Sequence, residues 1–296
     1  MNGIINVYKE KGYTSHDVVA KLRGILKQKK IGHTGTLDPE AEGVLPVCVG
    51  NATKVCDLIM DKEKKYRAVL LLGRTTDTQD DTGRVLSEAD VNVSESEIRE
   101  AISGFVGEYD QVPPMYSAIK IGGRRLYELA RKGEEVERPA RRVTIKAIDI
   151  CDVTIPRVTM EITCSKGTYI RTLCHDIGEK LGCGGIMESL LRTGSGDFML
   201  QDARKLDEIR RLVEEGNADT VLLPVDSVFG GLAALCANEE IYRLLRNGNP
   251  VPEKSLRGPV PEGAERVRIY DHLGTFTGIF EYKRESKMFK PVKLFL

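Results

Sequence analysis

The strand-like and helix-like segments of this chain follow one another in no regular order. Gly3–Tyr8 has the short apolar pattern of a strand, and Ser15–Leu26 has apolar residues at helical spacing, with its serine as the expected N-cap. Further along, Thr144–Val153 and Arg157–Cys164 alternate like two paired strands, and Ile170–Leu181 again has helical spacing, closed by a glycine. Because strands and helices do not alternate strictly, the sequence predicts an α+β fold and not a doubly wound one.

Polar stretches separate these segments. Gly32–Gly43 is rich in Gly and Thr, and Arg74–Arg84 is rich in Thr and Asp with few apolar residues, so the sequence predicts two polar loops. The spacing of Ser94 and Glu97 is that of a capping box, which predicts a short helix after it. Residues 115–142 are basic and contain glycines, with a weak central helix.

The charge of the chain is balanced overall but not evenly distributed. Lys plus Arg and Asp plus Glu both number 44, which taken alone argues against a nucleic-acid partner. However, Lys21–Lys30 contains no acidic residue, and Ile119–Lys132 contains only Glu128. Such runs are typical of solvated faces, but they are also the clustered cations that phosphate binding requires.

Several classes of protein are excluded by what the sequence lacks. The longest apolar runs, such as Ala68–Leu72, are far too short to span a bilayer, and the chain has no pattern of a signal peptide. The seven cysteines are scattered without a Cys-x-x-Cys, so we expect neither disulfides nor a metal site, but small buried apolar side chains. A reducing cytoplasm is therefore the expected compartment.

The composition shifts around Val228–Gly231. Beyond it the sequence predicts one helix at Glu239–Arg246 and three strands at Arg266–Tyr270, Thr275–Tyr282 and Phe289–Phe295. We therefore expect two domains, residues 1–230 and a small β-rich domain of residues 231–296.

One segment is a candidate for chemistry, the stretch GHTGTLDPEAEGVLP at residues 32–46. The pair Asp38 and Pro39 is by itself typical of a helix start. That interpretation leaves His33 unexplained, because it lies in a loop between Gly32 and Gly35, and glycines let a backbone approach a ligand closely.

This stretch resembles the catalytic motif of the tRNA pseudouridine synthase B (TruB) family. The resemblance extends over about residues 3–230, with a further match at Asn247–Val251, and other segments carry it too. They are Gly50–Lys54, Lys64–Arg67, Pro113–Lys120, Cys164–Thr172 and Gly178–Gly184.

The resemblance implies a pseudouridine synthase fold, a mixed and largely antiparallel sheet flanked by helices, followed by a small barrel-like PUA domain. It implies an isomerase that flips the T-loop uridine at tRNA position 55 out of its stack and re-forms its glycosidic bond at C5. Nothing is oxidised or consumed, so no cofactor is needed. The expected partner is the T-arm of tRNA, and the expected state is a monomer.

The resemblance also assigns roles to individual residues. Asp38 matches the catalytic aspartate, Arg171 the arginine paired with it, and Tyr66 the tyrosine that stacks on the flipped base. His33 matches the histidine that fills the place of the extruded uridine. Three further residues match substrate-contacting positions: Tyr169, Leu190 in the less regular stretch Gly185–Arg192, and Lys9, which is followed by Glu10 where the family often has Pro. The resemblance also implies an RNA-clasping insertion at residues 115–142. From the positive charge of this segment, we expect Arg124 and Arg125 to bind RNA phosphates.

Three chemical routes stay open for Asp38: attack at C1′, deprotonation at C2′, or addition to C6 of the base. All three require an ionised carboxylate, which a neighbouring arginine favours. Two other functions are also possible: an RNA chaperone with the same fold, and a relative that modifies RNA within protein–RNA particles. The chain lacks the long basic tails expected of such a relative.

Overall fold

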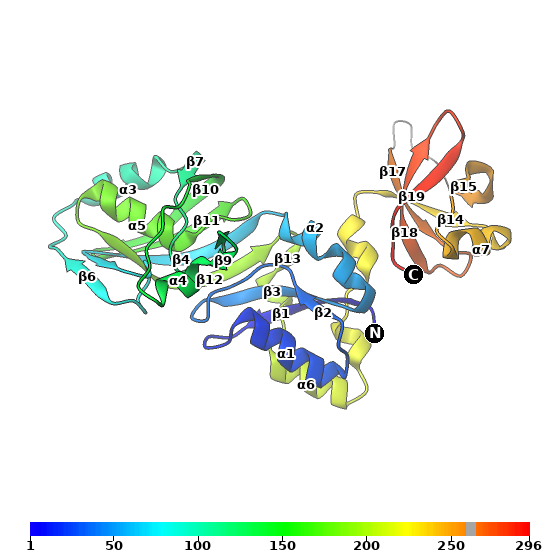
Figure 1. The fold of residues 1–296 in the computed structure, drawn as a ribbon, viewed down its shortest axis with the longest axis horizontal. Helices are drawn as coiled ribbons and strands as arrows, with labels where there is room; N and C mark the ends of the chain where they lie inside the picture. The colour runs from blue at the N-terminus through cyan, green and yellow to red at the C-terminus, as the bar shows by residue number, and fades with distance from the viewer. Residues whose placement is uncertain (259–264) are drawn as a thin grey trace.

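The computed structural model describes residues 1–258 and 265–296, so residues 259–264 of the expected C-terminal domain lie outside the described part. Figure 1 shows an elongated molecule in which a large sheet is followed by a smaller one near the C-terminus. The large sheet has nine strands: β1 (Gly3–Lys9), β2 (Ile31–His33), β3 (Glu42–Val49), β4 (Lys64–Leu72), β7 (Gly107–Gln111), β10 (Arg141–Thr154), β11 (Arg157–Cys164), β12 (Gly185–Ser195) and β13 (Phe198–Met199).

The strand order of this sheet is β1-β3-β12-β4-β11-β10-β7, with β2 paired to β3 and β13 to β12. All of its pairs are antiparallel except β12 with β3. The expected mixed, largely antiparallel sheet is therefore present. One of its inner strands, β12, includes the stretch Gly185–Arg192, in which the sequence predicted no strand.

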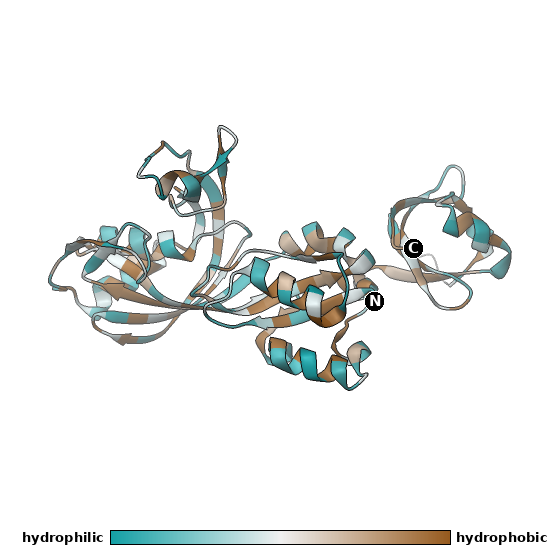
Figure 2. Ribbon diagram, turned by 60° about the horizontal axis from the view of Figure 1, so that its bottom comes forward, coloured by the Kyte–Doolittle hydropathy of each residue, from teal (hydrophilic) through white to brown (hydrophobic). Residues whose placement is uncertain are grey.

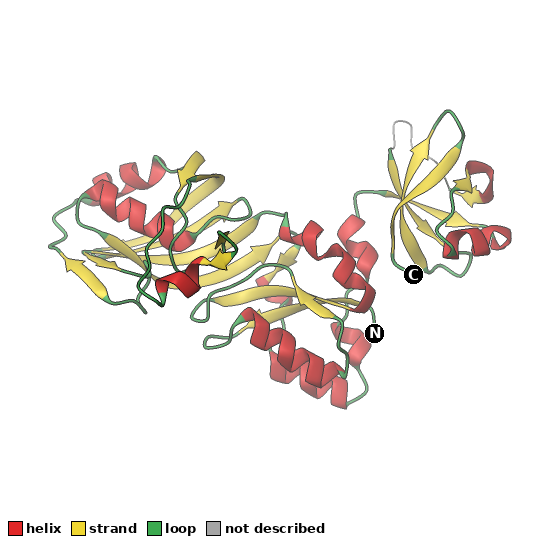
Figure 3. Cartoon of the chain, in the orientation of Figure 1, coloured by secondary structure: helices red, strands yellow, loops and turns green. Residues whose placement is uncertain are grey.

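Helices cover the large sheet in two groups (Figure 3). Helices α1 and α6 pack beside β1 and β3 around one apolar cluster, while α3 and α5 pack against β4, β10 and β11 around another. The helix bounds are α1 (Ser15–Leu26), α2 (Cys56–Met60), α3 (Glu95–Ser103), α4 (Leu126–Ala130), α5 (Ile170–Leu181), α6 (Leu206–Glu214) and α7 (Tyr242–Arg246), with short 3₁₀ helices η1 (Gly50–Val55), η2 (Leu200–Asp202), η3 (Ala218–Val221), η4 (Val225–Phe229), η5 (Glu239–Ile241) and η6 (Glu253–Ser255).

The predicted helix signals can be compared with the observed caps. Ser94 and Glu97 form the expected capping box of α3, and α5 ends at Gly182 in the left-handed conformation, with φ 75°. The predicted cap of α1 is wrong by one residue. Thr14, and not Ser15, is the N-cap, because its side chain and that of Asp17 satisfy each other's backbone N–H groups.

Two short hairpins lie outside the large sheet. Strand β5 (Arg74–Thr76) pairs with β6 (Val85–Glu88), so the predicted polar loop at Arg74–Arg84 begins with a strand. Strand β8 (Lys120–Ile121) pairs with β9 (Arg124–Arg125) inside the 115–142 segment. Figures 1 and 2 together show this segment standing out from the large sheet.

The C-terminal sheet has the order β15-β19-β18-β17-β14-β16. The three predicted strands are confirmed, and three short ones were not predicted. The bounds are β14 (Ala233–Ala237), β15 (Val251–Pro252), β16 (Leu256–Arg257), β17 (Arg266–Tyr270), β18 (Phe276–Lys283) and β19 (Met288–Leu294). This sheet has its own apolar core, while Phe295 and Ile279 join a second cluster that includes residues of β3 and α2.

The cysteines differ in part from the expectation. Cys48, Cys164, Cys174 and Cys183 are buried and Cys56 is half-buried, but two are exposed, so the expectation of buried apolar side chains is wrong for these: Cys151 on β10 and Cys236 on β14. Among the described residues, no helix has the length and apolar character needed to cross a membrane.

Candidate active site

Asp38 lies in the loop between β2 and β3, and that loop is held by hydrogen bonds at several points. The Leu37 N–H donates to Ser15 Oγ (2.9 Å), and the Gly12 N–H donates to Pro39 O (2.9 Å). No regular helix forms after Asp38, so its pairing with Pro39 is not the helix start that local sequence alone would suggest. The Asp38 side chain remains 38% exposed and can meet a ligand.

Arg171, in the first turn of α5, reaches Asp38 from the other side of the site. Its Nε lies 2.9 Å from Asp38 Oδ2, and its Nη2 donates to Asp38 Oδ1 (3.3 Å). The guanidinium thus meets both carboxylate oxygens side-on, one through a hydrogen bond and one through a close ion-pair contact, a geometry that arginine provides and lysine does not. The Arg171 side chain is only 5% exposed, so it is not the surface residue of an amphipathic helix.

Backbone and carboxylate oxygens fix the rest of the Arg171 guanidinium. Its Nη1 donates to Thr78 O (3.0 Å) and its Nη2 to Tyr116 O (2.8 Å). Asp80 Oδ2 lies 3.8 Å from Nε, and the Asp80 side chain is 14% exposed. The site therefore draws together the Asp38 loop, the polar loop after β5 and the base of the 115–142 segment.

Asp80 was not among the predicted site residues. Its carboxylate accepts hydrogen bonds from Thr78 Oγ1 (2.6 Å), Thr82 Oγ1 (2.6 Å) and the Thr82 N–H (3.0 Å). The only sequence signal was the density of Thr and Asp in the predicted loop, which does not distinguish an inward-facing acid from a solvated one.

Tyr66 and His33 flank the Asp38 loop. Tyr66 on β4 is 8% exposed, and burial raises the pKa of its phenol. His33 ends β2, packs edge-on against His16 with ring centroids 5.2 Å apart, and is half-buried. Burial, followed by the charges of His16 and Arg192, lowers the pKa of His33 to about 4, so its ring is neutral at neutral pH.

The other predicted contact residues lie at different distances from this centre. Lys9 is fully buried, and its Nζ donates to Ala41 O (2.6 Å), Pro39 O (3.0 Å) and Glu10 O (3.2 Å), so it supports the Asp38 loop from behind. Tyr169 is the N-cap residue of α5 and exchanges two hydrogen bonds with Gln111.

Leu190 lies on β12 and packs against the core beside β4. Arg124 and Arg125 are not at the centre. They are exposed on the β8–β9 hairpin, where Arg124 lies 3.4 Å from Glu134 and Arg125 donates to Tyr127 Oη (2.7 Å). The structure thus gathers the residues around Asp38 but leaves the two clasp arginines on an outlying segment.

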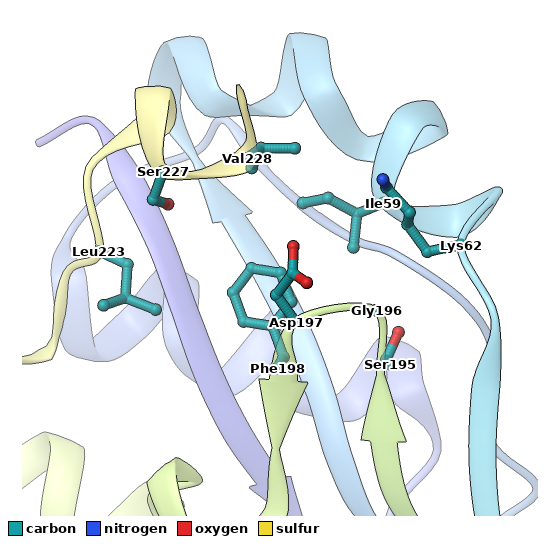
Figure 4. A pocket seen from close by; sticks show the side chains of 9 residues that line it. All are labelled: Ile59, Lys62, Ser195, Gly196, Asp197, Phe198, Leu223, Ser227 and Val228. Carbon is teal, nitrogen blue, oxygen red and sulfur yellow. The ribbon is translucent and has the colours of Figure 1, made fainter. Parts of the chain in front are cut away.

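A cavity of about 160 Å³ lies elsewhere, between the β12–β13 turn, α2 and η4 (Figure 4). Ile59, Phe198 and Val228 give it an apolar lining, and the buried Ser195 hydroxyl has no hydrogen-bond partner among the described residues. None of the predicted site residues lines it. Within the described ranges, no cluster of three His, Cys, Asp or Glu side chains could hold a metal ion.

The geometry can be compared with known proteins. Two family models match the chain, the TruB family pseudouridylate synthase N-terminal domain at residues 23–170 and the tRNA pseudouridylate synthase B C-terminal domain at residues 171–230. A tRNA pseudouridine synthase B of Lachnoclostridium phytofermentans is 52% identical over the full length of both chains. One of Clostridium perfringens is 45% identical over 100% of this chain and 99% of that one.

Solved structures agree at the level of the fold. The Cbf5–Nop10–Gar1 complex contains a chain that is 26% identical, with a TM-score of 0.72, covering 99% of this chain and 85% of that one. A chain of an H/ACA RNP bound to a substrate RNA is 24% identical, with a TM-score of 0.71 and the same coverage. The expected pseudouridine synthase fold with a barrel-like, PUA-like C-terminal sheet is confirmed. The chain therefore belongs to the TruB family of pseudouridylate synthases.

Proposed function

We propose that this chain isomerises uridine to pseudouridine in tRNA, and that its target is the T-loop uridine at position 55. The observation that carries the proposal is the side-on pairing of Arg171 with a partly exposed Asp38, at 2.9 Å, in a loop flanked by Tyr66 and His33. Relatives that are 45–52% identical over nearly their whole length carry the name tRNA pseudouridine synthase B.

The reaction needs an ionised carboxylate beside the ribose, and Asp38 is the proposed group. Arg171 holds both of its oxygens, so the carboxylate is oriented before the substrate arrives. Attack at C1′, removal of a proton from C2′ and addition to C6 all use this same ionised group.

The base must leave its stack before Asp38 can reach it. His33 is the proposed filler of the vacated place, since a neutral, flat and polar ring can stack where a charged one would be poorly solvated. Tyr66, Tyr169 and Leu190 are the proposed contacts to the flipped nucleotide, and Lys9 is proposed to support the loop that carries Asp38.

We propose that different parts of the chain have different roles. Residues 1–230 would form the catalytic domain, with residues 115–142 as a clasp on the RNA, and residues 231–296 a PUA-like RNA-binding domain. Every proposed residue comes from one chain, so a monomer is sufficient. Because the substrate is tRNA, we expect the enzyme to work in the cytoplasm.

A T-arm stem-loop labelled with tritium at C5 of the target uridine tests the proposal, because C5 loses its hydrogen when the new bond forms. We expect release of tritium from this stem-loop and none from a stem-loop with cytidine at the target position. Binding of the RNA without release would favour the RNA chaperone. Release from full tRNA but not from the isolated arm would contradict the proposed T-arm substrate.

A further inference from the structure

Arg192 lies between the Asp38 loop and Tyr66 in the large sheet. It is part of β12, where its neighbour on one side is Gly43 of β3 and its neighbour on the other side is Tyr66 of β4. Gly43 lies at the end of the loop that carries Asp38. Across the three neighbouring strands, Arg192 therefore lies directly between the end of that loop and Tyr66, the proposed base-stacking tyrosine.

The Arg192 side chain contacts both ends of the Asp38 loop, at Gly35 and Val44, which we call the neck of the loop. Its Nε donates to Val44 O (2.6 Å) and its Nη2 donates to Gly35 O (3.3 Å), and in the sheet register it lies opposite Tyr66. Gly35 precedes Asp38 in the chain and Val44 follows it. The guanidinium thus ties the two ends of the loop to each other, beside the strand that carries Tyr66.

The backbone around this contact leaves little room. Gly43 has φ +104°, and a Cβ added to it would lie 2.2 Å from Arg192 O. Only glycine can adopt this conformation at this distance from the neighbouring strand. The loop neck therefore packs closely against β12, and a small displacement of Arg192 would displace the loop as well.

The charge of Arg192 is hard to explain by packing alone. The residue is 1% exposed, and no carboxylate of the described residues pairs with it, so the hydrogen bonds of its guanidinium go to the carbonyl oxygens of Val44 and Gly35. Burying an ion without a counter-ion is costly, and an apolar side chain of similar size would fill the space at less cost.

We propose that Arg192 is a positioning residue for the isomerisation, which sets the distance between the Asp38 carboxylate and the Tyr66 ring by holding the neck of the Asp38 loop. This rests on the proposed function. Displacing a reacting group by about 1 Å can lower a rate by about 100-fold, so removal of the Arg192 guanidinium should be visible in the chemical step.

The test compares Arg192→Lys, which keeps the charge but not the fork of donors, with Arg192→Met, which removes both. Arg157→Met is the matched control, because Arg157 is an exposed residue of the same sheet that pairs with Glu188 (2.7 Å). Single-turnover tritium release from the T-arm, its Kd, and amide hydrogen exchange across the Asp38 loop are measured for all of them.

We expect both Arg192 variants to lose about 100-fold in the single-turnover rate constant, with Kd changed less than about threefold. Amide exchange should quicken in residues 34–44 and stay unchanged in α3. Arg157→Met should behave as the wild type. A merely structural arginine would instead weaken RNA binding and global protection together with the rate.

Three results would overturn the proposal: wild-type release by Arg192→Lys, a Kd that weakens in proportion to the rate, or loss of the folded circular-dichroism spectrum in both variants. Failure of the proposed function looks different, because the wild-type chain itself would then release no tritium. In that case amide exchange in the Arg192 variants still reports whether this residue holds the loop.

Discussion

Arg171 Nε lies 2.9 Å from Asp38 Oδ2, although 133 residues separate the two in the chain. The pair joins the first turn of α5 to the loop between β2 and β3, and the arginine is buried while the carboxylate is partly open. A charge pair with one accessible side is suited to chemistry, because the substrate can reach the group that the buried partner orients.

Asp38→Asn should abolish multiple turnover, with a loss of at least about 10³-fold, because the amide cannot act as a nucleophile or base. Binding of the T-arm should persist, since the side chain keeps its shape. Tritium release and filter binding measure the two quantities. Glu40→Gln is the control in the same loop, because the exposed Glu40 pairs, among the described residues, with Lys11 alone (3.3 Å) and should tolerate the change. Measurable multiple turnover by Asp38→Asn would remove Asp38 from the mechanism.

Arg171→Lys should lower turnover by about 100-fold, while RNA affinity changes less. Lysine donates from a single nitrogen, whereas the bonds to Thr78 O on one side and to Asp38 and Tyr116 O on the other leave from two separate nitrogens of the guanidinium. Arg204→Lys, at a half-buried arginine that pairs with Glu208 away from the site, is the matched control. A near-normal rate constant in Arg171→Lys would show that the fork of donors is unimportant.

Lys9 should make stability depend on pH in a known direction. Burial lowers the pKa of Lys9 from 10.5 to about 8, so between these values the unfolded state binds more protons than the folded one. The free energy of unfolding should therefore rise with pH through this window, relative to Lys9→Met, by up to about 1.4 kcal/mol per pH unit. Urea denaturation of both proteins from pH 7 to 10 measures the difference.

Lys11→Met is the control for that experiment, because the Lys11 side chain is 63% exposed. The contribution of Lys9 is least favourable below pH 8, where the buried amine is charged in the folded state. Curves for wild type and Lys9→Met that stay parallel from pH 7 to 10 would mean that Lys9 keeps an ordinary pKa.

Local patterns were enough to predict much of the fold. The capping box at Ser94 and Glu97 and the glycine after α5 predict helix ends, because caps depend on residues a few positions apart. Strand β12 escaped prediction. Its register shifts twice, between Met187 and Ser189 and between its Arg192 and Gly194 pairings, so its side chains do not alternate regularly.

The sequence likewise predicted some residues of the candidate site and missed others. The resemblance of the motifs predicted that Asp38 and Arg171 would meet, and their contact is observed. Asp80 and Arg192 had no such signal. Asp80 meets Arg171, and Arg192 meets Val44 and Gly35, all far away in sequence. A polar loop and an irregular strand look alike in sequence whether their charged residues face solvent or the interior. Only the folded chain brings these groups to the partners of Asp38 and to the ends of its loop.

The 115–142 segment gives the last prediction, that it grips RNA phosphates as a clasp. Leu126 and Leu129 of α4 are buried, but α4 has only five residues, too few for a helix that is stable on its own. Arg124 and Arg125 are exposed on the hairpin beside it. We expect trypsin to cut this segment in the free enzyme and T-arm RNA to block the cut.

Replacing both Arg124 and Arg125 with alanine should weaken T-arm binding and flatten its salt dependence. For every phosphate that the variant no longer binds, the slope of log Kd against log salt should fall by roughly 0.7–0.9, because fewer counterions are released. Arg99→Ala with Arg210→Ala is the control pair, since both arginines are exposed and lie on α3 and α6, away from the segment. An unchanged salt slope, or equal protease resistance with and without RNA, would rule out the clasp and leave the role of Asp38 untouched, because the two arginines lie outside the Asp38 site.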